Sequence, residues 1–378
     1  MRILAIETSC DDTGIAILEA SGRPTSAKFK VLSNIVSSQQ IHANYGGVFP
    51  IMAKREHQTN LVPVLMQALK LAKLANPKPK ILNPKQIQAL KKILEKESNL
   101  FEYTKEFLEK YEKPDVDMIA VTHGPGLEPC LWVGVNFAKA LSYFWNIPVV
   151  PVNHIEAHIL VNFLEQPKIE FPAVSLIVSG GHTQLILVKK IGSYKIIGET
   201  KDDAAGECFD KAARILGLGY PGGPIISEIA SRANNAPKTF TLPRPMMHSK
   251  DYDFSFSGLK TAVLYKLRDT KPEITKSESF IQEMCVQVQQ AIIDVLIKKT
   301  INAAKDFKAK TIILGGGVSA NQELKKQFAQ KSEIPVIFPE PKLSTDNGLM
   351  IAVTGYFNRT KKIGWQRLSV HPNLRVEK

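Results

Sequence analysis

The sequence predicts an α/β protein built from two related halves. Short apolar strands alternate with longer helical patterns over the 378 residues, which is typical of α/β folds. A strand hairpin with a polar turn occurs twice, at residues 2–18 and again at residues 173–189. This repetition indicates a duplicated architecture. At roughly 150 residues per domain the length allows two or three domains, and we expect them at 1–150 and 151–378.

The first half begins with strands at 2–6 and 14–18, and the polar turn between them holds Glu7, Asp11 and Asp12. A helix is predicted at 51–74, because apolar residues recur there at three- and four-residue spacing. The other elements expected in this half are strands at 29–37, 118–122 and 148–152, a helical region at 84–111, and a helix ending near 145.

The second half opens with a helix at 154–164 and then the second hairpin. Its other predicted strands lie at 194–199, 311–314 and 336–338, and its other helices at about 207–216, 224–234, 276–305, 317–330 and 346–358. The last of these helices is expected to pack back on the N-terminal half.

The chain is strongly basic. It has 49 Lys and Arg against 36 Asp and Glu, a net charge of +13, which favours a phosphate-bearing partner such as a nucleic acid. Residues 70–114 hold eleven Lys and six acidic residues. We expect a helical insertion at about 76–113 with a basic surface. The alternative is a solvated helical hairpin that binds nothing.

Cysteine usage and hydropathy indicate a cytoplasmic protein with no membrane association. The four cysteines are dispersed and form no CxxC pair, so a disulfide framework and a Cys-rich zinc site are not indicated. No apolar stretch is expected to be long enough to cross a bilayer, and Glu7 follows the start too closely for a signal peptide.

Two histidines mark a candidate metal site. His154 and His158 follow a strand at the start of a helix, with Asn153 as a plausible N-cap, and residues four apart share one helix face. Glu156 lies about 200° around the helix from His154, which argues against a zincin-type protease. Asp346 is one candidate among many for a third ligand. Two imidazoles and a carboxylate would suit Fe(II) or Zn(II), whereas a pair without a third ligand would be structural or coincidental.

Three glycine loops are candidates for phosphate or nucleotide binding. They lie at 179–183, 315–321 and 220–224, and the first two directly follow strands. None matches GxxxxGK[ST] or GxGxxG. Each alone is more often a tight turn, but three in one α/β chain favour a nucleotide site. Asp210, in an acidic run with Glu207, could hold ribose hydroxyls. Glu207 and Lys211 could instead simply stabilise the helix surface.

Taken together, these motifs resemble the TsaD family, the catalytic subunit that makes threonylcarbamoyladenosine in tRNA. The resemblance covers nearly the whole chain and is interrupted at about 76–113. It rests on the motifs at 7–13, 42–50, 55–57, 154–158, 179–183, 203–207, 209–211, 220–224, 316–321 and 345–347.

The resemblance implies the actin/Hsp70/sugar-kinase (ASKHA) fold, with two ribonuclease-H-like lobes and a nucleotide cleft between them. It also implies one divalent metal ion held by His154, His158 and Asp346, with Fe(II) expected and Zn(II) as the alternative. Within the first motif, Asp11 and Glu7 are the candidate catalytic residues. The adenylate would be bound by Ile177, Val178, Ser179, Gly180, Gly181, Asp210, Gly223, Ser227 and Asn321. The position of Ser227 is often a carboxylate in relatives, and a hydroxyl there supplies no charge.

The implied reaction transfers a threonylcarbamoyl group from threonylcarbamoyl-AMP to N6 of adenosine 37 in tRNAs that read ANN codons. Bacterial members work with a TsaB-like paralogue and a TsaE-like ATPase, whereas archaeal and eukaryotic members use a kinase-containing complex. Residues 126–131 are nearer the archaeal and eukaryotic form, and most other motifs read as bacterial.

Two other functions compete with this one. An ASKHA-fold ATPase or kinase would use the glycine loops but gives no role to the histidine pair. A non-enzymatic scaffold would be signalled by loss of His154, His158 or Asp346, and all three are present.

Overall fold

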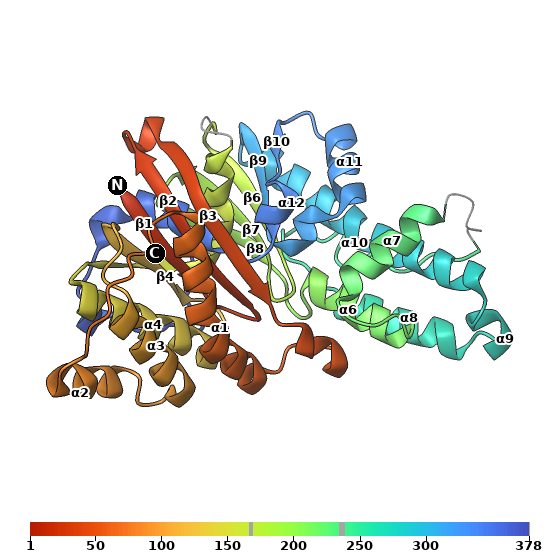
Figure 1. Ribbon diagram of the computed structural model, residues 1–378. Helices are drawn as coiled ribbons and strands as arrows, with labels where there is room; N and C mark the ends of the chain where they lie inside the picture. Colours follow the sequence, from red (N-terminus) through yellow and green to blue (C-terminus); the bar gives the residue numbers. More distant parts are fainter. Residues whose placement is uncertain (166–168, 234–238, 378) are drawn as a thin grey trace. The chain divides into compact units, whose positions relative to one another are not determined.

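The computed structural model describes residues 1–165, 169–233 and 239–377 (Figure 1). Contacts divide the chain into two compact units. Unit 1 comprises residues 1–40, 48–167 and 346–376, and unit 2 comprises residues 41–47, 168–345 and 377–378. The domain boundary at residue 150 stays a prediction.

Each unit is built on one five-stranded sheet of the same topology. In unit 1 the order is β3-β2-β1-β4-β5, with strands Arg2–Glu7, Asp12–Ser21, Lys28–Ser38, Met118–Gly124 and Val149–Asn153 for β1 to β5. In unit 2 it is β10-β9-β6-β7-β8, with strands Ala173–Val178, Thr183–Lys190, Ser193–Glu199, Thr311–Gly315 and Val336–Ile337 for β6 to β10.

The pairing of the strands confirms the duplication expected from the two hairpins. β1, β2 and β3 form an antiparallel meander, β4 lies parallel to β1, and β5 lies parallel to β4. β6, β7 and β8 repeat the meander, and β9 and β10 repeat the two parallel additions. The parallel strands are nearly continuous apolar runs, as expected where both faces of a sheet are covered.

The helices of unit 1 enclose its sheet. They are α1 (Pro50–Leu71), α2 (Pro84–Ile93), α3 (Ser98–Lys110), α4 (Glu128–Trp145), α5 (His154–Leu160) and α13 (Gly348–Phe357). The single helical region expected at 84–111 is therefore two helices. Leu90 and Leu94 of this region, and Leu82 just before it, are buried in the same core as β1 and β4. Residues 84–111 are thus packed into the unit, and only their outer face is a surface feature.

The helices of unit 2 are α6 (Ala205–Ile215), α7 (Gly222–Arg232), α8 (Ser257–Arg268), α9 (Pro272–Thr275), α10 (Glu278–Asp306), α11 (Gln322–Lys331) and α12 (Pro341–Ser344). Of the helix expected at 224–234, residue 234 lies outside the described residues. The helix expected at 317–330 is a short 3₁₀ turn, Gly317–Ala320, followed by α11, because Asn321 caps α11 instead of continuing a helix.

Helix α8 was not predicted, and its capping explains why. Asp202 accepts hydrogen bonds from the backbone N–H groups of Phe256 and Ser257 at 2.8 and 3.2 Å, so the cap lies far from the helix in sequence. Local start signals do not reveal such a helix.

Helix α10 corrects the expectation that no stretch reaches membrane-spanning length. It is long and apolar enough by composition, but 72% of its apolar window is buried inside the structure. Its apolar side chains form much of the unit 2 core, as in the central helix of a packed domain.

Helix α13 lies directly on the backbone of β2. A Cβ at Gly348 would be 2.4 Å from the nitrogen of Ala16, and one at Gly14 would be 2.9 Å from the nitrogen of Gly348. Only glycine at both positions allows this approach, which places the start of α13 against β1 and β2.

The substitution Gly348→Ala should therefore destabilise the protein by about 1–3 kcal/mol, because backbone atoms cannot yield to the added methyl group. The midpoint of thermal unfolding measures this effect. Gly47→Ala is the control, since no atom lies within 4 Å of its Cβ position. Equal midpoints for the two variants would contradict the close packing.

Candidate functional site

Helix α5 presents two imidazoles on one face. The side chain of Asn153 caps the helix by accepting from the nitrogens of Ile155 and Glu156 at 2.9 and 3.0 Å, so the helix begins at His154. The rings of His154 and His158 lie 4.7 Å apart between centroids and are nearly perpendicular. This arrangement aims both rings at the same point in space.

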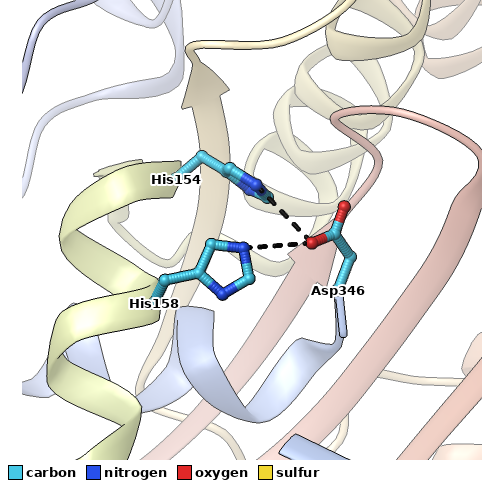
Figure 2. A group of neighbouring side chains, drawn as sticks. All are labelled: His154, His158 and Asp346. Atoms are coloured by element: carbon cyan, nitrogen blue, oxygen red, sulfur yellow. Dashed lines mark ion pairs between the residues drawn. The ribbon is translucent and has the colours of Figure 1, made fainter. Parts of the chain in front are cut away.

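Asp346 reaches that point from the segment before α13 (Figure 2). Its Oδ1 lies 3.5 Å from Nε2 of His154 and 3.2 Å from Nε2 of His158. One candidate ligand atom from each residue lies within 4.8 Å of the others. The structure brings the three predicted metal ligands together, and their role as ligands stays a prediction.

The donor set fits a metal ion. His158 is only 1% exposed, and neither of its ring nitrogens has a hydrogen-bond partner in the described structure. A buried polar group without a hydrogen bond lowers the stability of the folded state. A buried imidazole that lacks a hydrogen bond and lies beside a carboxylate therefore fits the role of a metal ligand. Two imidazoles with one carboxylate suit a divalent transition metal.

Glu7 lies behind His154. Its carboxylate is fully buried and accepts from the nitrogen of Ser9 at 2.5 Å and from Oγ1 of Thr122 at 2.6 Å, and it lies 3.3 Å from Nδ1 of His154. A carboxylate at Nδ1 fixes the tautomer and leaves Nε2 free for a metal. The catalytic role predicted for Glu7 is untested, and this position suits an orienting group.

The surrounding charges shift two pKa values. Burial lowers the pKa of His154, but the carboxylates of Asp346 and Glu7 outweigh it and raise the pKa to about 9. Burial and then the charge of Asp346 raise the pKa of Asp12 to about 7, with Asp11 and Glu7 adding to the effect. Both shifts report an excess of negative charge around the histidines. Asp11 belongs to this group through the loop that joins β1 and β2.

His57 contacts this loop from α1, and the sequence assigned no role to it. It is fully buried on α1, with Nδ1 at 2.7 Å from Oγ1 of Thr13 and Nε2 at 2.9 Å from the carbonyl of Cys10. It therefore holds the Asp11–Asp12 loop from both ends. The sequence signal for His57 was its place in the 55–57 motif. Its contact with Thr13 spans 44 residues and cannot be predicted from sequence spacing.

The predicted adenylate residues lie on neighbouring elements of unit 2. Ile177 and Val178 end β6 with fully buried side chains, so only their backbones could meet a ligand. Gly180 and Gly181 have no atom within 4 Å of their Cβ positions, which leaves their backbones open. Ser179 holds the turn through its Oγ, which accepts from the nitrogen of His182 at 3.1 Å.

Helices α6, α7 and α11 contribute the other predicted residues. Asp210 Oδ1 accepts from the nitrogen of Gly222 at 2.7 Å, beside Gly223 at the start of α7. Ser227 Oγ lies 3.4 Å from Nδ2 of Asn321, whose Oδ1 caps α11. The glycine loop after β9 joins them, because a Cβ at Gly316 would be 2.5 Å from the carbonyl of Val178.

These features define a class of protein. Two meander-led sheets of identical strand order, glycine turns after β6 and β9, and helices packed on the sheets are those of the ASKHA fold. The structure of component A of the Acidaminococcus fermentans (R)-2-hydroxyglutaryl-CoA dehydratase aligns with a TM-score of 0.50 at 11% identity, covering 96% of this chain and 100% of that one. Full-length HypF, in the phosphate- and nucleotide-bound form, aligns with a TM-score of 0.52 at 11% identity, covering 95% of this chain and 55% of that one.

Within this class, the chain belongs to the TsaD family of tRNA N6-adenosine threonylcarbamoyltransferases, whose sequence profile matches residues 30–79 and 97–353. The enzyme of that name from Thermosipho africanus is 41% identical over all of both chains. Those from Dictyoglomus turgidum and Porphyromonas gingivalis are 42% and 41% identical, covering 99% and 94% of this chain and 98% and 92% of theirs. Between residues 30 and 353 the profile leaves 80–96 unmatched, so α3 belongs to the part shared with the family.

Metal affinity should rise with pH. At pH 7 the metal-free His154 is protonated, because its pKa is about 9, and the proton must leave before Nε2 can bind a metal. Affinity for Zn(II) or Fe(II) should therefore increase up to about tenfold per pH unit between about pH 7 and 9 and then level off. Calorimetry at pH 7.5 in buffers of different ionisation enthalpy would detect the released proton. Affinity that does not change with pH would contradict this assignment.

The Asp210→Asn variant should bind AMP roughly ten- to a hundredfold more weakly, because it keeps an acceptor for Gly222 but loses the charge available to ribose hydroxyls. Titration calorimetry with AMP measures this. Asp269→Asn, at an exposed carboxylate after α8, is the matched control. If both variants bind as the parent does, Asp210 does not contact the ligand.

Proposed function

We propose that this chain transfers the threonylcarbamoyl group from threonylcarbamoyl-AMP to N6 of adenosine 37 in tRNAs that read ANN codons. Membership of the TsaD family and relatives of that activity along the full chain support the reaction. Among the structural features, the orphaned, buried His158 beside Asp346 carries the proposal, since an ATPase or kinase of the same fold would have no use for it.

In the proposed mechanism His154, His158 and Asp346 hold one divalent metal, with Fe(II) favoured over Zn(II). A bound metal would act as a Lewis acid that polarises the carbamoyl carbonyl or orients the threonyl group. Glu7 keeps Nε2 of His154 directed at the metal by holding Nδ1. The open backbones of Gly180 and Gly181, with Asp210 and Asn321, hold the adenylate that departs.

The amine of adenosine is a weak nucleophile and loses a proton when it is acylated. We place the acceptor for that proton in the loop of Asp11 and Asp12. Burial and the charge of Asp346 raise the pKa of Asp12 to about 7, a value that would suit proton exchange near neutral pH, and this supports the placement. Adenosine 37 lies in an anticodon loop, where a base can leave its stack at low cost.

The proposed partners are tRNA and the proteins that supply threonylcarbamoyl-AMP. A TsaB-like paralogue with a TsaE-like ATPase is the first set to test, because most motifs read as bacterial, and the kinase-containing complex is the second. A tRNA substrate supports a cytoplasmic location.

The His158→Ala variant should lose the modification while it stays folded. The parent chain, incubated with either partner set, threonine, bicarbonate, ATP and unmodified tRNA, should yield threonylcarbamoyladenosine in nucleoside digests analysed by mass spectrometry. The variant should reduce the yield at least about a hundredfold, because one of three metal ligands is gone.

His248→Ala is the control for this experiment, since His248 is exposed on unit 2 and lies outside the cluster. Yields that match the parent in the His158 variant would refute the metal assignment. Rapid ATP hydrolysis by the chain alone, with no modified nucleoside from the parent, would favour the ATPase instead.

A further inference from the structure

Positive charge is concentrated on one short segment of unit 1. Residues 70–96 contain eight lysines and one exposed carboxylate, Glu95, a surplus that exceeds half of the net charge of the whole chain. The following residues 97–113, which include α3, hold three lysines and five glutamates. The basic character of the region thus belongs to α2 and its flanks, while α3 is nearly balanced.

Helix α2 displays these lysines on an ordered support. Asn83 and Gln86 form a capping box at its start, and Leu82, Leu90 and Leu94 bury their side chains in the core of unit 1. The opposite face is exposed, and residues three, four and seven apart share a helix face. Lys85 and Lys92 therefore project on the same side, about 10 Å apart along the axis.

The lysines of this face have no carboxylate partners. We define the α2 lysine surface as Lys80, Lys85, Lys91, Lys92 and Lys96, all exposed. In the described structure none of them forms an ion pair, whereas Lys78 just before them pairs with Glu112 at 2.9 Å. Unpaired ammonium groups on α2 and its flanks keep their full charge available to a partner.

A buried polar network ties this surface to the loop that holds Asp11 and Asp12. Glu97, directly after Lys96, is 1% exposed and accepts from Nε2 of Gln58 at 2.5 Å, and Nζ of Lys54 lies 3.1 Å from it. Gln58 and Lys54 are on α1, next to His57, which holds the Asp11–Asp12 loop. One helix therefore fixes both the lysine surface and the loop within unit 1.

We propose that the α2 lysine surface binds the phosphate backbone of the tRNA substrate. Lysine as a point charge suits phosphate contacts, which position a nucleic acid without reading its sequence. Protein interfaces are instead depleted in lysine and enriched in aromatic residues. Ile81 is the one large exposed apolar side chain in residues 80–96, and none of these residues is aromatic.

The surface lies within residues 80–96, a segment that the family profile does not match. The proposed contact therefore lies outside the residues that the profile describes. The inference rests on the proposed function for the identity of the RNA, but binding and modification are measured separately below.

The test is a triple variant, Lys85→Gln, Lys91→Gln and Lys92→Gln, in the full chain with its partner proteins. Binding of fluorescently labelled unmodified tRNA is followed by anisotropy at 50, 100 and 200 mM KCl. Each lost phosphate contact should reduce the slope of log affinity against log salt by roughly 0.7–0.9, so the slope should fall by about two to three. Affinity at 50 mM KCl should fall at least about tenfold.

The matched control removes three other exposed lysines without ion pairs in the described chain, with Lys189→Gln, Lys190→Gln and Lys195→Gln on β7 and β8. This control should bind as the parent does. Circular dichroism and the thermal midpoint establish that both variants are folded. Point changes are preferred to deletion of the segment, because its buried leucines are part of the core.

Three results would overturn the proposal. The first is unchanged tRNA affinity and salt slope in the α2 variant. The second is an equal loss of affinity in both variants, which would mean that tRNA binding depends only on the overall charge of the protein. Loss of binding to a partner protein with tRNA binding intact would assign the surface to that protein. Failure of the proposed function is a different outcome, because the parent would then yield no threonylcarbamoyladenosine even where tRNA binds.

Discussion

The seating of α13 on the backbone of β2 is the contact on which the candidate metal site depends. Asp346 lies two residues before Gly348, and the absence of a side chain at Gly348 and at Gly14 brings this segment against the sheet. Asn347 then caps α13 by accepting from the nitrogen of Met350 at 3.2 Å. Asp346 is left pointing at α5 rather than continuing a helix, although it is far from the histidines in sequence.

The electrostatics of unit 1 indicate that the candidate metal site lacks positive charge. The shifts of His154 and Asp12 have one cause in common, since several carboxylates, of which Glu7 is fully buried, gather around the histidines with too little positive charge to balance them. A protonated His154 offsets part of this charge in the metal-free chain. A divalent cation would offset more of it and would also satisfy the nitrogens of His158, so one ion resolves two separate costs.

The sequence predicted the fold well where the signals were local. The two hairpins and the apolar parallel strands predict the duplicated sheets, because strand periodicity and turns need only neighbouring residues. The histidine spacing predicts one face of α5 for the same reason. Asp346, by contrast, was only one candidate among many until the family resemblance singled it out. Helix α8, capped by Asp202, and the role of His57 were missed because their partners are 54 and 44 residues away.

Residues 70–114 illustrate how charge counting and structure complement each other. A single charge count over residues 70–114 combines two helices of different net charge. The structure separates them into α2, which carries lysines, and α3, which carries glutamates. The buried leucines explain why a segment unmatched by the family profile is nevertheless ordered. Within unit 1, α1 contacts both the loop of Asp11 and Asp12 and the segment that carries the α2 lysine surface. It therefore fixes the distance between a group of carboxylates and a group of lysines. A polyanionic substrate would be repelled by the first group and attracted by the second, so a basic surface outside the site is the physical means to retain it.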